Sequence, residues 1–285
     1  MIGVFDSGFG GLTVMQALVA RFPRLAFVYL GDHANVPYGD RQSDEIVALT
    51  EAGVAHLFAR GCRLVLLGCN TATAIAGRTL QREWLPQSRW KQGHNVLGIV
   101  APTVEAATQT PWAVTEPQYP QKYNSDTIVV FGTTRTISSG VYVEEITKRC
   151  PRVAVVQVAC PGLAGAIEDG ADTGVIDGIV AEACRRAQAE AAPRGADHVI
   201  LGCTHYPLVA DAFERHLPAR TRILSQPDIV ADSLEDYLAR HPHYVGNSAA
   251  GGVLLTTGDP DGVTEAAARF WPVGLKFQKA EALVA

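Results

Sequence analysis

Two cysteines, Cys69 and Cys203, stand in closely similar surroundings although they lie far apart in the chain. Each follows a short apolar run that ends in glycine, residues 65–68 for the first and 199–202 for the second. Such a run is typical of a parallel strand that is buried on both faces, and ligands of α/β folds bind just beyond the carboxyl ends of these strands. A single free cysteine is more often a small buried hydrophobe. The repeated pattern, with polar residues after each thiol, predicts a chemical role for this pair.

Two thiols on opposite sides of one small molecule suit stereoinversion at a carbon atom. One of them, as a thiolate, removes a proton, and the other, as a thiol, donates a proton to the opposite face, so no cofactor is needed. A free thiol has a pKa of roughly 8.5, and general acid–base catalysis works best near the operating pH. One thiol therefore needs help from its neighbours, for which His205 and Asp6 are the candidates.

The residues that would hold a ligand also follow strand ends. Free backbone N–H groups at the start of a helix can receive an anionic group, and Ser7, Asn70, Thr71 and Thr204 add polar side chains. The glycine-rich residues 6–11 match neither a P-loop nor a dinucleotide fingerprint, because the required lysine and the final glycine are missing. Two interpretations of Asp6 stay open at this point: a carboxylate beside a ligand, or the N-cap of a helix.

Two further loops carry candidate groups. Tyr38 stands between Pro37 and Gly39 in a loop rich in turn residues, and we expect it to be exposed and to line a pocket. A second cluster of hydroxyls, which includes Thr133 and Thr136, follows the predicted strand 128–131 and exceeds what helix capping needs.

Composition limits the classes of protein to consider. The chain has 285 residues and a net charge of −5, without a basic run, which argues against a nucleic-acid partner. No leader-like opening and no apolar run near the roughly 20 residues of a membrane span is present, so we expect a soluble cytoplasmic protein without a membrane partner. The six cysteines form no C-x-x-C pair, and we expect no disulfide and no metal site. Four of them are assigned to packing: Cys62, Cys150, Cys160 and Cys184.

Strand-like and helix-like segments alternate along the chain, which predicts an α/β fold with mainly parallel sheets. The separation of the two thiol strands favours two domains. We expect residues 1–98 and 208–285 to form the first domain and residues 99–207 the second. Residues 110–126, with three prolines among polar residues, predict a surface loop.

The sequence resembles the glutamate racemase family, part of the aspartate/glutamate racemase superfamily, whose members interconvert L- and D-glutamate without a cofactor for peptidoglycan biosynthesis. The resemblance spans residues 2 to about 240. It rests on four motifs in the same order: Asp6-Ser7-Gly8, Pro37-Tyr38-Gly39, Cys69-Asn70-Thr71 and Cys203-Thr204-His205-Tyr206-Pro207.

The resemblance implies two similar domains related by a pseudo-twofold axis, with the active site in the cleft between them, and a homodimer. It implies that Cys69 and Cys203 are the acid–base residues, that Asp6 and His205 assist them, and that the carboxylate of Glu168 lies near the second thiol. The residues that would contact glutamate are Asp6, Ser7, Pro37, Tyr38, Gly39, Asn70, Thr71, Thr133, Thr136, Thr204 and His205.

Several features depart from the family pattern. Small residues between Cys160 and Glu168 leave the position of that carboxylate open, and Ser225-Gln226-Pro227 replaces an acidic turn of many members. The loop 110–126 is unfamiliar, and the N-terminal extension of nucleotide-activated members is absent, so that regulation is not predicted. Three rival interpretations stay open: a racemase or decarboxylase for another substrate, a binding protein without turnover, and a thiol–disulfide sensor.

Overall fold

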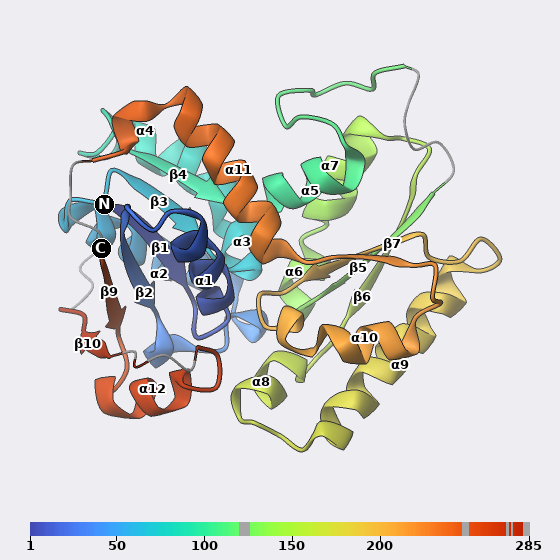
Figure 1. Ribbon diagram of the computed structural model, residues 1–285. Helices are drawn as coiled ribbons and strands as arrows, with labels where there is room; N and C mark the ends of the chain where they lie inside the picture. The colour runs from blue at the N-terminus through green and yellow to red at the C-terminus, as the bar shows by residue number, and fades with distance from the viewer. Residues whose placement is uncertain (120–125, 247–250, 272–273, 275, 282–285) are drawn as a thin grey trace.

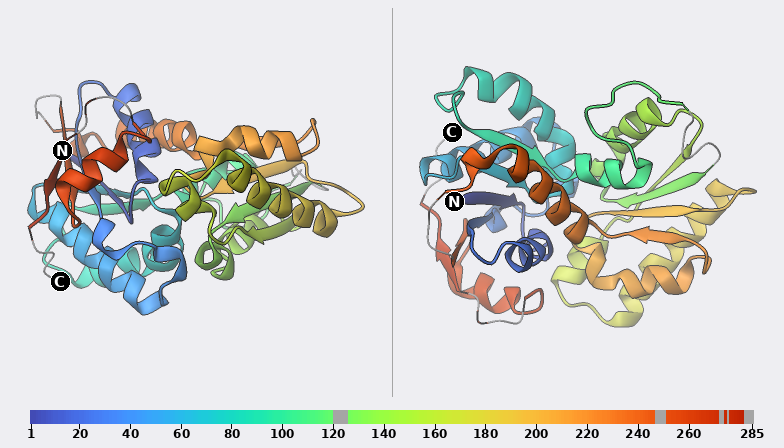
Figure 2. Two further views of the ribbon diagram at one scale, coloured as in Figure 1. Left: turned by 90° about the horizontal axis from the view of Figure 1, so that it is seen from below. Right: turned by 45° about the horizontal axis from the view of Figure 1, so that its top comes forward.

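The computed structural model describes residues 1–119, 126–246, 251–271, 274 and 276–281. Its elements form two lobes, each with a central sheet and helices on both faces (Figures 1 and 2). The first lobe contains the chain up to β4 and the C-terminal elements. Its elements are β1 (Ile2–Asp6), α1 (Gly11–Arg21), β2 (Ala26–Gly31), α2 (Ser43–Ala59), β3 (Leu64–Leu67), α3 (Asn70–Thr79), α4 (Leu85–Gln87), β4 (Asn95–Gly98), α11 (Gln226–Arg240), β9 (Gly251–Thr256), α12 (Pro260–Ala267) and β10 (Phe277–Lys279).

The second lobe is built from the middle of the chain. Helix α5 (Val100–Thr108) leads into it from β4. Its other elements are β5 (Thr127–Gly132), α6 (Thr134–Ser138), α7 (Val141–Arg149), β6 (Ala154–Ala159), α8 (Leu163–Glu168), α9 (Thr173–Ala191), β7 (His198–Gly202), α10 (Ala210–His216) and β8 (Arg222–Leu224).

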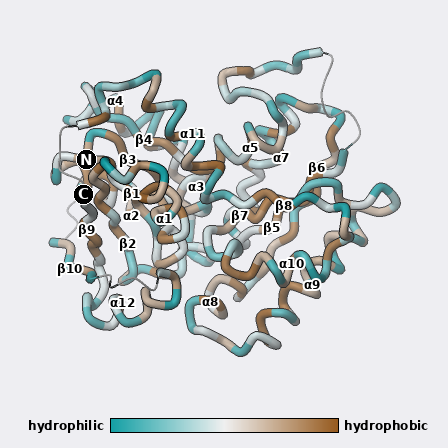
Figure 3. Tube along the Cα trace, viewed as in Figure 1, coloured by the Kyte–Doolittle hydropathy of each residue, from teal (hydrophilic) through white to brown (hydrophobic). Residues whose placement is uncertain are grey.

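All strand pairs in the described residues are parallel. The first sheet has the order β10-β9-β2-β1-β3-β4 and the second the order β6-β5-β7-β8. The order β2-β1-β3-β4 is thus repeated as β6-β5-β7-β8, and β3 and β7 occupy equivalent places. Hydrophobic residues follow the central strands, as continuous burial requires (Figure 3). The predicted fold class, two α/β domains with parallel sheets, is confirmed.

The predicted return to the first domain near residue 208 comes too early. Strand β8 pairs with β7 in the second sheet, with Ile200 beside Leu224, and α10 packs against α9. The chain leaves the second domain after β8, where α11 begins and packs against α1. The sequence predicts a strand over residues 222–224, but nothing in these three residues shows which sheet the strand joins, because its pairing with β7 is a contact between distant segments.

Residues 110–119 of the predicted surface loop contain no helix or strand and are mostly exposed. Residues 120–125 of that loop lie outside the described part. Within the described ranges, no helix has the length and apolar character needed to cross a membrane.

Candidate active site

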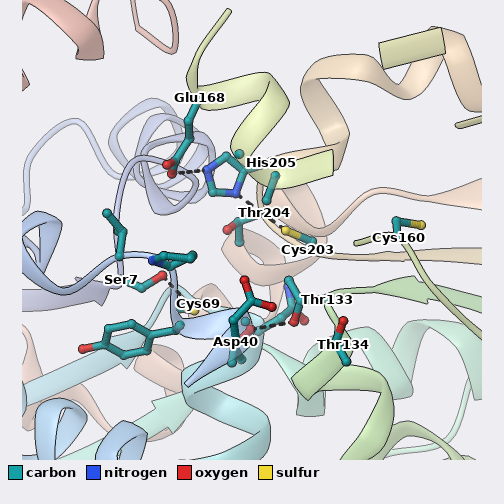
Figure 4. A pocket seen from close by; sticks show the side chains of 18 of the residues that line it. Ser7, Asp40, Cys69, Thr133, Thr134, Cys160, Glu168, Cys203, Thr204 and His205 are labelled. Atoms are coloured by element: carbon teal, nitrogen blue, oxygen red, sulfur yellow. Dashed lines mark hydrogen bonds and ion pairs between the residues drawn. The ribbon is translucent and has the colours of Figure 1, made fainter. Parts of the chain in front are cut away.

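The carboxyl ends of strands from both sheets enclose a cavity of about 150 Å³. Figure 4 shows its side chains approaching from both lobes. Of the residues that the sequence predicted for the site, those that line the cavity are Ser7, Pro37, Tyr38, Gly39, Cys69, Asn70, Thr71, Thr133, Glu168, Cys203, Thr204 and His205. Asp6 and Thr136 lie behind this lining.

The first thiol stands between β3 and α3. Cys69 is the N-cap of α3, and its Sγ accepts a hydrogen bond from the backbone N–H of Ala72 at 3.4 Å. The hydroxyl of Ser7 lies 3.4 Å from the same sulfur. Burial and the charge of Asp6 raise the pKa of Cys69 to about 12, although both hydrogen bonds act in the opposite direction. Before a substrate binds, Cys69 is therefore a protonated thiol at neutral pH.

The second thiol has a different set of neighbours. Sγ of Cys203 lies 3.6 Å from Nδ1 of His205, and Nε2 of this ring lies 2.7 Å from Oε1 of Glu168. The three side chains form a row across the cavity wall (Figure 4). Burial acts to lower the pKa of His205, but hydrogen bonds and charges from Cys203 and Glu168 raise it well above its usual value. The Cys203–His205–Glu168 row can therefore carry a proton on the imidazole beside the thiol.

The loop between β1 and α1 must be glycine-rich at this point. A Cβ atom at Gly10 would overlap the side chains of Thr204 and His205. The hydroxyl of Thr13 on α1 donates to the carbonyl of Thr204 at 3.0 Å. The loop thus brings the first domain against the residues that follow the second thiol.

Asp6 ends β1 and is almost fully buried beside this loop. Its Oδ1 accepts the backbone N–H of Gly8 at 2.8 Å. Burial raises its pKa to about 6, and the opposing effects of His205 and of the Gly8 and Gly11 N–H groups do not offset this. The N-cap of α1 is Gly10, so a conventional side-chain cap is not the role of Asp6. Asp6 acts on the electrostatics of Cys69 from behind the cavity lining.

The predicted exposure of Tyr38 is wrong. The residue lines the cavity but is only 2% exposed, because its hydroxyl points inward and donates to Oδ2 of Asp32 at 2.6 Å. Asn35 and Thr257 also donate to the carboxylate of Asp32. The loop is therefore held by a buried hydrogen-bond network, which residue types alone did not reveal.

Three threonines connect the two domains at the edge of the cavity. The hydroxyl of Thr71 on α3 lies 2.9 Å from that of Thr133 and 3.3 Å from that of Thr136. Thr133 also caps α6 by accepting the backbone N–H of Thr136 at 3.2 Å. Thr136 is fully buried, so it supports Thr133 and Thr71 rather than lining the cavity.

Sequence reasoning missed several lining residues. Cys160, which was assigned to packing, lies in the cavity wall after β6. Its position after a strand end, followed by Pro161, was the available signal. Burial and the nearby Cys203 raise its pKa to about 12. The other lining residues that were not predicted are Val36, Asp40, Thr134, Pro161, Gly162, Ala164 and Gly165.

Comparisons with known proteins agree with this arrangement. Residues 2–231 match the model of the family described as Asp/Glu/Hydantoin racemase. Glutamate racemase from Caulobacter sp. (strain K31) is 48% identical over 284 residues, which cover 98% of this chain and 99% of that protein. Glutamate racemase from Phenylobacterium zucineum is 46% identical over 282 residues, with coverage of 98% and 99%.

Solved structures show the same fold. Glutamate racemase isoform RacE1 from Bacillus anthracis superposes with a TM-score of 0.86 at 26% identity and covers 100% of this chain and 98% of its own. Glutamate racemase from Thermus thermophilus, solved with β-chloro-D-alanine, gives a TM-score of 0.78 at 28% identity, with coverage of 98% and 95%. The match over residues 2–231 and the identity across nearly the whole chain confirm the resemblance, and the chain belongs to the Asp/Glu/hydantoin racemase family.

Proposed function

We propose that this chain is a glutamate racemase in which Cys69 and Cys203 exchange protons with the Cα atom of glutamate from opposite faces. One observation carries the proposal: two thiols at equivalent strand ends, after β3 and after β7, line one small cavity. Relatives that are 40–48% identical over nearly their full length are glutamate racemases, which supports glutamate as the substrate. The product D-glutamate would serve peptidoglycan biosynthesis.

The chemistry balances without another reactant. A thiolate takes the Cα proton, which leaves a carbanion whose charge spreads into the adjacent carboxylate. The opposite thiol then donates its proton to the other face, and the two sulfurs have exchanged protonation states. Because burial keeps Cys69 protonated in the empty site, Cys69 starts as the acid and Cys203 as the base in one direction. His205, whose pKa is raised, would take part by carrying a proton 3.6 Å from the sulfur of Cys203.

The remaining lining groups would hold the amino acid. Hydroxyls and amides of Ser7, Asn70, Thr71, Thr133 and Thr204 supply donors for the two carboxylates, together with backbone N–H groups at the start of α3. One side of the cavity is closed by Pro37, Tyr38 and Gly39. Thr136 and Asp6 act from behind, through Thr133 and Cys69 respectively.

The family resemblance further supports a homodimer that works in the cytoplasm. Analytical ultracentrifugation of the purified chain measures the first of these points. A mass of one chain at micromolar concentration would contradict the dimer, while leaving the reaction chemistry unaffected.

Circular dichroism of the substrate tests the function directly. Purified protein is given L-glutamate, then D-glutamate, and then each enantiomer of aspartate, with no cofactor added. We expect loss of optical signal with both glutamate enantiomers, and loss of this activity in both Cys69→Ser and Cys203→Ser. Inversion of aspartate alone would retain the two-thiol chemistry and change the substrate. No inversion of any amino acid would favour a binding protein.

A further inference from the structure

A cluster of neutral polar side chains is buried where the two domains join. Asn70, Thr103, Tyr142 and Gln226 are each at most 2% exposed. They come from α3 of the first domain, from α7 of the second, and from α5 and α11, the two helices that follow the interdomain crossings. Only Asn70 of this group lines the active-site cavity. Gln226 belongs to the turn in which this sequence departs from the acidic turn of many family members.

Gln226 and Asn70 pair through both amide atoms. Nδ2 of Asn70 donates to Oε1 of Gln226 at 2.5 Å, and Nε2 of Gln226 donates to Oδ1 of Asn70 at 3.0 Å. The hydroxyl of Tyr142 donates to the same Oδ1 at 2.8 Å. The acceptor oxygen of Asn70 thus receives two donors.

One hydroxyl fixes the orientation of this whole network. Thr103 donates its proton to the backbone carbonyl of Ile99 at 2.7 Å, so its oxygen acts as an acceptor toward Gln226. The amide atom of Gln226 that lies 2.8 Å from this oxygen must then be Nε2, which places Oε1 toward Asn70. The orientation of the Asn70 amide follows, because only its Nδ2 can donate to Oε1.

Fixing the amide of Asn70 leaves one donor for the substrate. A primary amide has two N–H groups, and within the described residues one of them is used by Gln226. Asn70 follows Cys69 directly and lines the cavity, so the second N–H is available to a carboxylate oxygen of the amino acid. A flipped amide would present an acceptor there and repel the carboxylate.

We propose that Gln226 is a positioning residue for racemisation, which, with Tyr142, holds the Asn70 amide with an N–H donor toward the substrate. The proposal rests on the proposed function. The network also includes residues of α5 and α11. The N–H of Asn70 is therefore held toward the substrate only when the two domains have their observed arrangement. This distinguishes Gln226 from a residue that merely stabilises the fold, since its effect must pass through Asn70.

A double-mutant cycle tests this dependence. Gln226→Met keeps the length of the side chain and removes both hydrogen bonds to Asn70, together with the contacts of Nε2 with Thr103 and Tyr142, and Asn70→Ala removes the donor itself. Racemisation of glutamate is measured for wild type, both single variants and the double variant, at a temperature well below the unfolding midpoint of each. Tyr142→Phe, which removes one donor to Asn70, is the milder second variant. Gln188→Met on the exposed side of α9 is the matched control.

We expect Gln226→Met to lower kcat/KM about tenfold, mainly through a higher KM, since a hydrogen bond to a charged substrate group is lost. Tyr142→Phe should give a smaller loss, and Gln188→Met should match wild type. In the Asn70→Ala background, Gln226→Met should add less than about twofold. An unchanged KM in Gln226→Met, or a tenfold loss that persists without Asn70, would overturn the proposal.

A structural measurement separates this proposal from the proposed function. If the wild-type protein fails to racemise glutamate, the proposed function fails. A crystal structure of Gln226→Met then decides the positioning role by itself. A turned or disordered Asn70 amide would support it, and an Asn70 side chain unchanged from wild type would contradict it.

Discussion

Nε2 of His205 lies 2.7 Å from Oε1 of Glu168, while the other nitrogen of the ring faces the sulfur of Cys203. Glu168 thereby fixes which ring nitrogen points to the thiol. Although burial acts to raise its pKa, the hydrogen bond and charge of His205 hold the pKa of Glu168 below its usual value. The carboxylate is therefore charged at neutral pH and stabilises a proton on the ring.

Replacing this carboxylate should lower both the activity and the basicity of the ring. In Glu168→Gln, we expect the pKa of His205 to fall, because the charge that opposes its burial is gone. We expect kcat to fall about tenfold, which corresponds to the loss of one hydrogen bond to a charged group. NMR titration of the His205 ring and steady-state kinetics measure the two effects. Glu182→Gln, at an exposed residue on α9, is the control. An unchanged His205 titration in Glu168→Gln would show that Glu168 does not stabilise the proton on this ring.

Asp6 should make stability depend on pH. Its pKa rises from 3.8 to about 6 on folding, so the stability linked to it is complete below about pH 3.8 and is lost as pH rises through about 6. Asp6→Asn removes this loss and keeps an acceptor for the Gly8 N–H. Relative to wild type, the free energy of unfolding of the variant should rise by about 2.5 kcal/mol between pH 4 and pH 7.

Urea unfolding at several pH values measures this difference. Asp211→Asn is the control, because the hydrogen bond from Arg215 lowers the pKa of this exposed carboxyl, so it titrates below this pH range and the difference from wild type should stay nearly constant. A difference between wild type and Asp6→Asn that stays constant from pH 4 to pH 7 would show that Asp6 has an ordinary pKa.

Tyr38→Phe tests the buried network under the cavity. The change removes the donor to Asp32 and leaves Asn35 and Thr257 as its partners. We expect the free energy of unfolding to fall by about 1–2 kcal/mol, which is the usual cost of losing one hydrogen bond to a buried carboxylate. Tyr119→Phe, at a residue that is 68% exposed, should change it by less than about 0.5 kcal/mol. Equal effects of the two variants would contradict the network.

Cys160 is the third thiol of the cavity wall and should not be a proton carrier. Its Sγ contacts the carbonyl of Val158 at 3.9 Å, and it follows β6 rather than β3 or β7, whose equivalent ends carry Cys69 and Cys203. Cys160→Ala should therefore keep kcat/KM within about threefold of wild type, as the change removes one small buried group. Steady-state kinetics beside Cys203→Ala measure this. A loss of a hundredfold or more would assign Cys160 a part in the proton transfers.

The sequence predicted those features that depend on residue type and short-range pattern. The apolar runs before Cys69 and Cys203 identified β3 and β7, and their glycines placed both thiols at strand ends. The pattern could not show that Tyr38 is buried, because its hydrogen bond to Asp32 depends on how the loop folds back.

Contacts between distant segments account for the other differences. The three-residue strand β8 belongs to the second sheet through its pairing with β7, which no local signal announces. Glu168 stands at the end of α8 and contacts His205, which lies 37 residues further along the chain. Gln226 lies far from Asn70 in the chain, and only the packing of α11 brings the two amides together.

Isotope incorporation tests the two-thiol mechanism most directly. Wild-type protein converts L-glutamate in deuterated buffer, and mass spectrometry follows deuterium at Cα in the remaining L-glutamate and in the new D-glutamate during the first turnovers. With two thiols on opposite faces, the new D-glutamate should carry solvent deuterium while the remaining L-glutamate stays largely unlabelled. Equal labelling of both enantiomers from the start, or D-glutamate without deuterium, would mean that a single base serves both faces and would contradict the account.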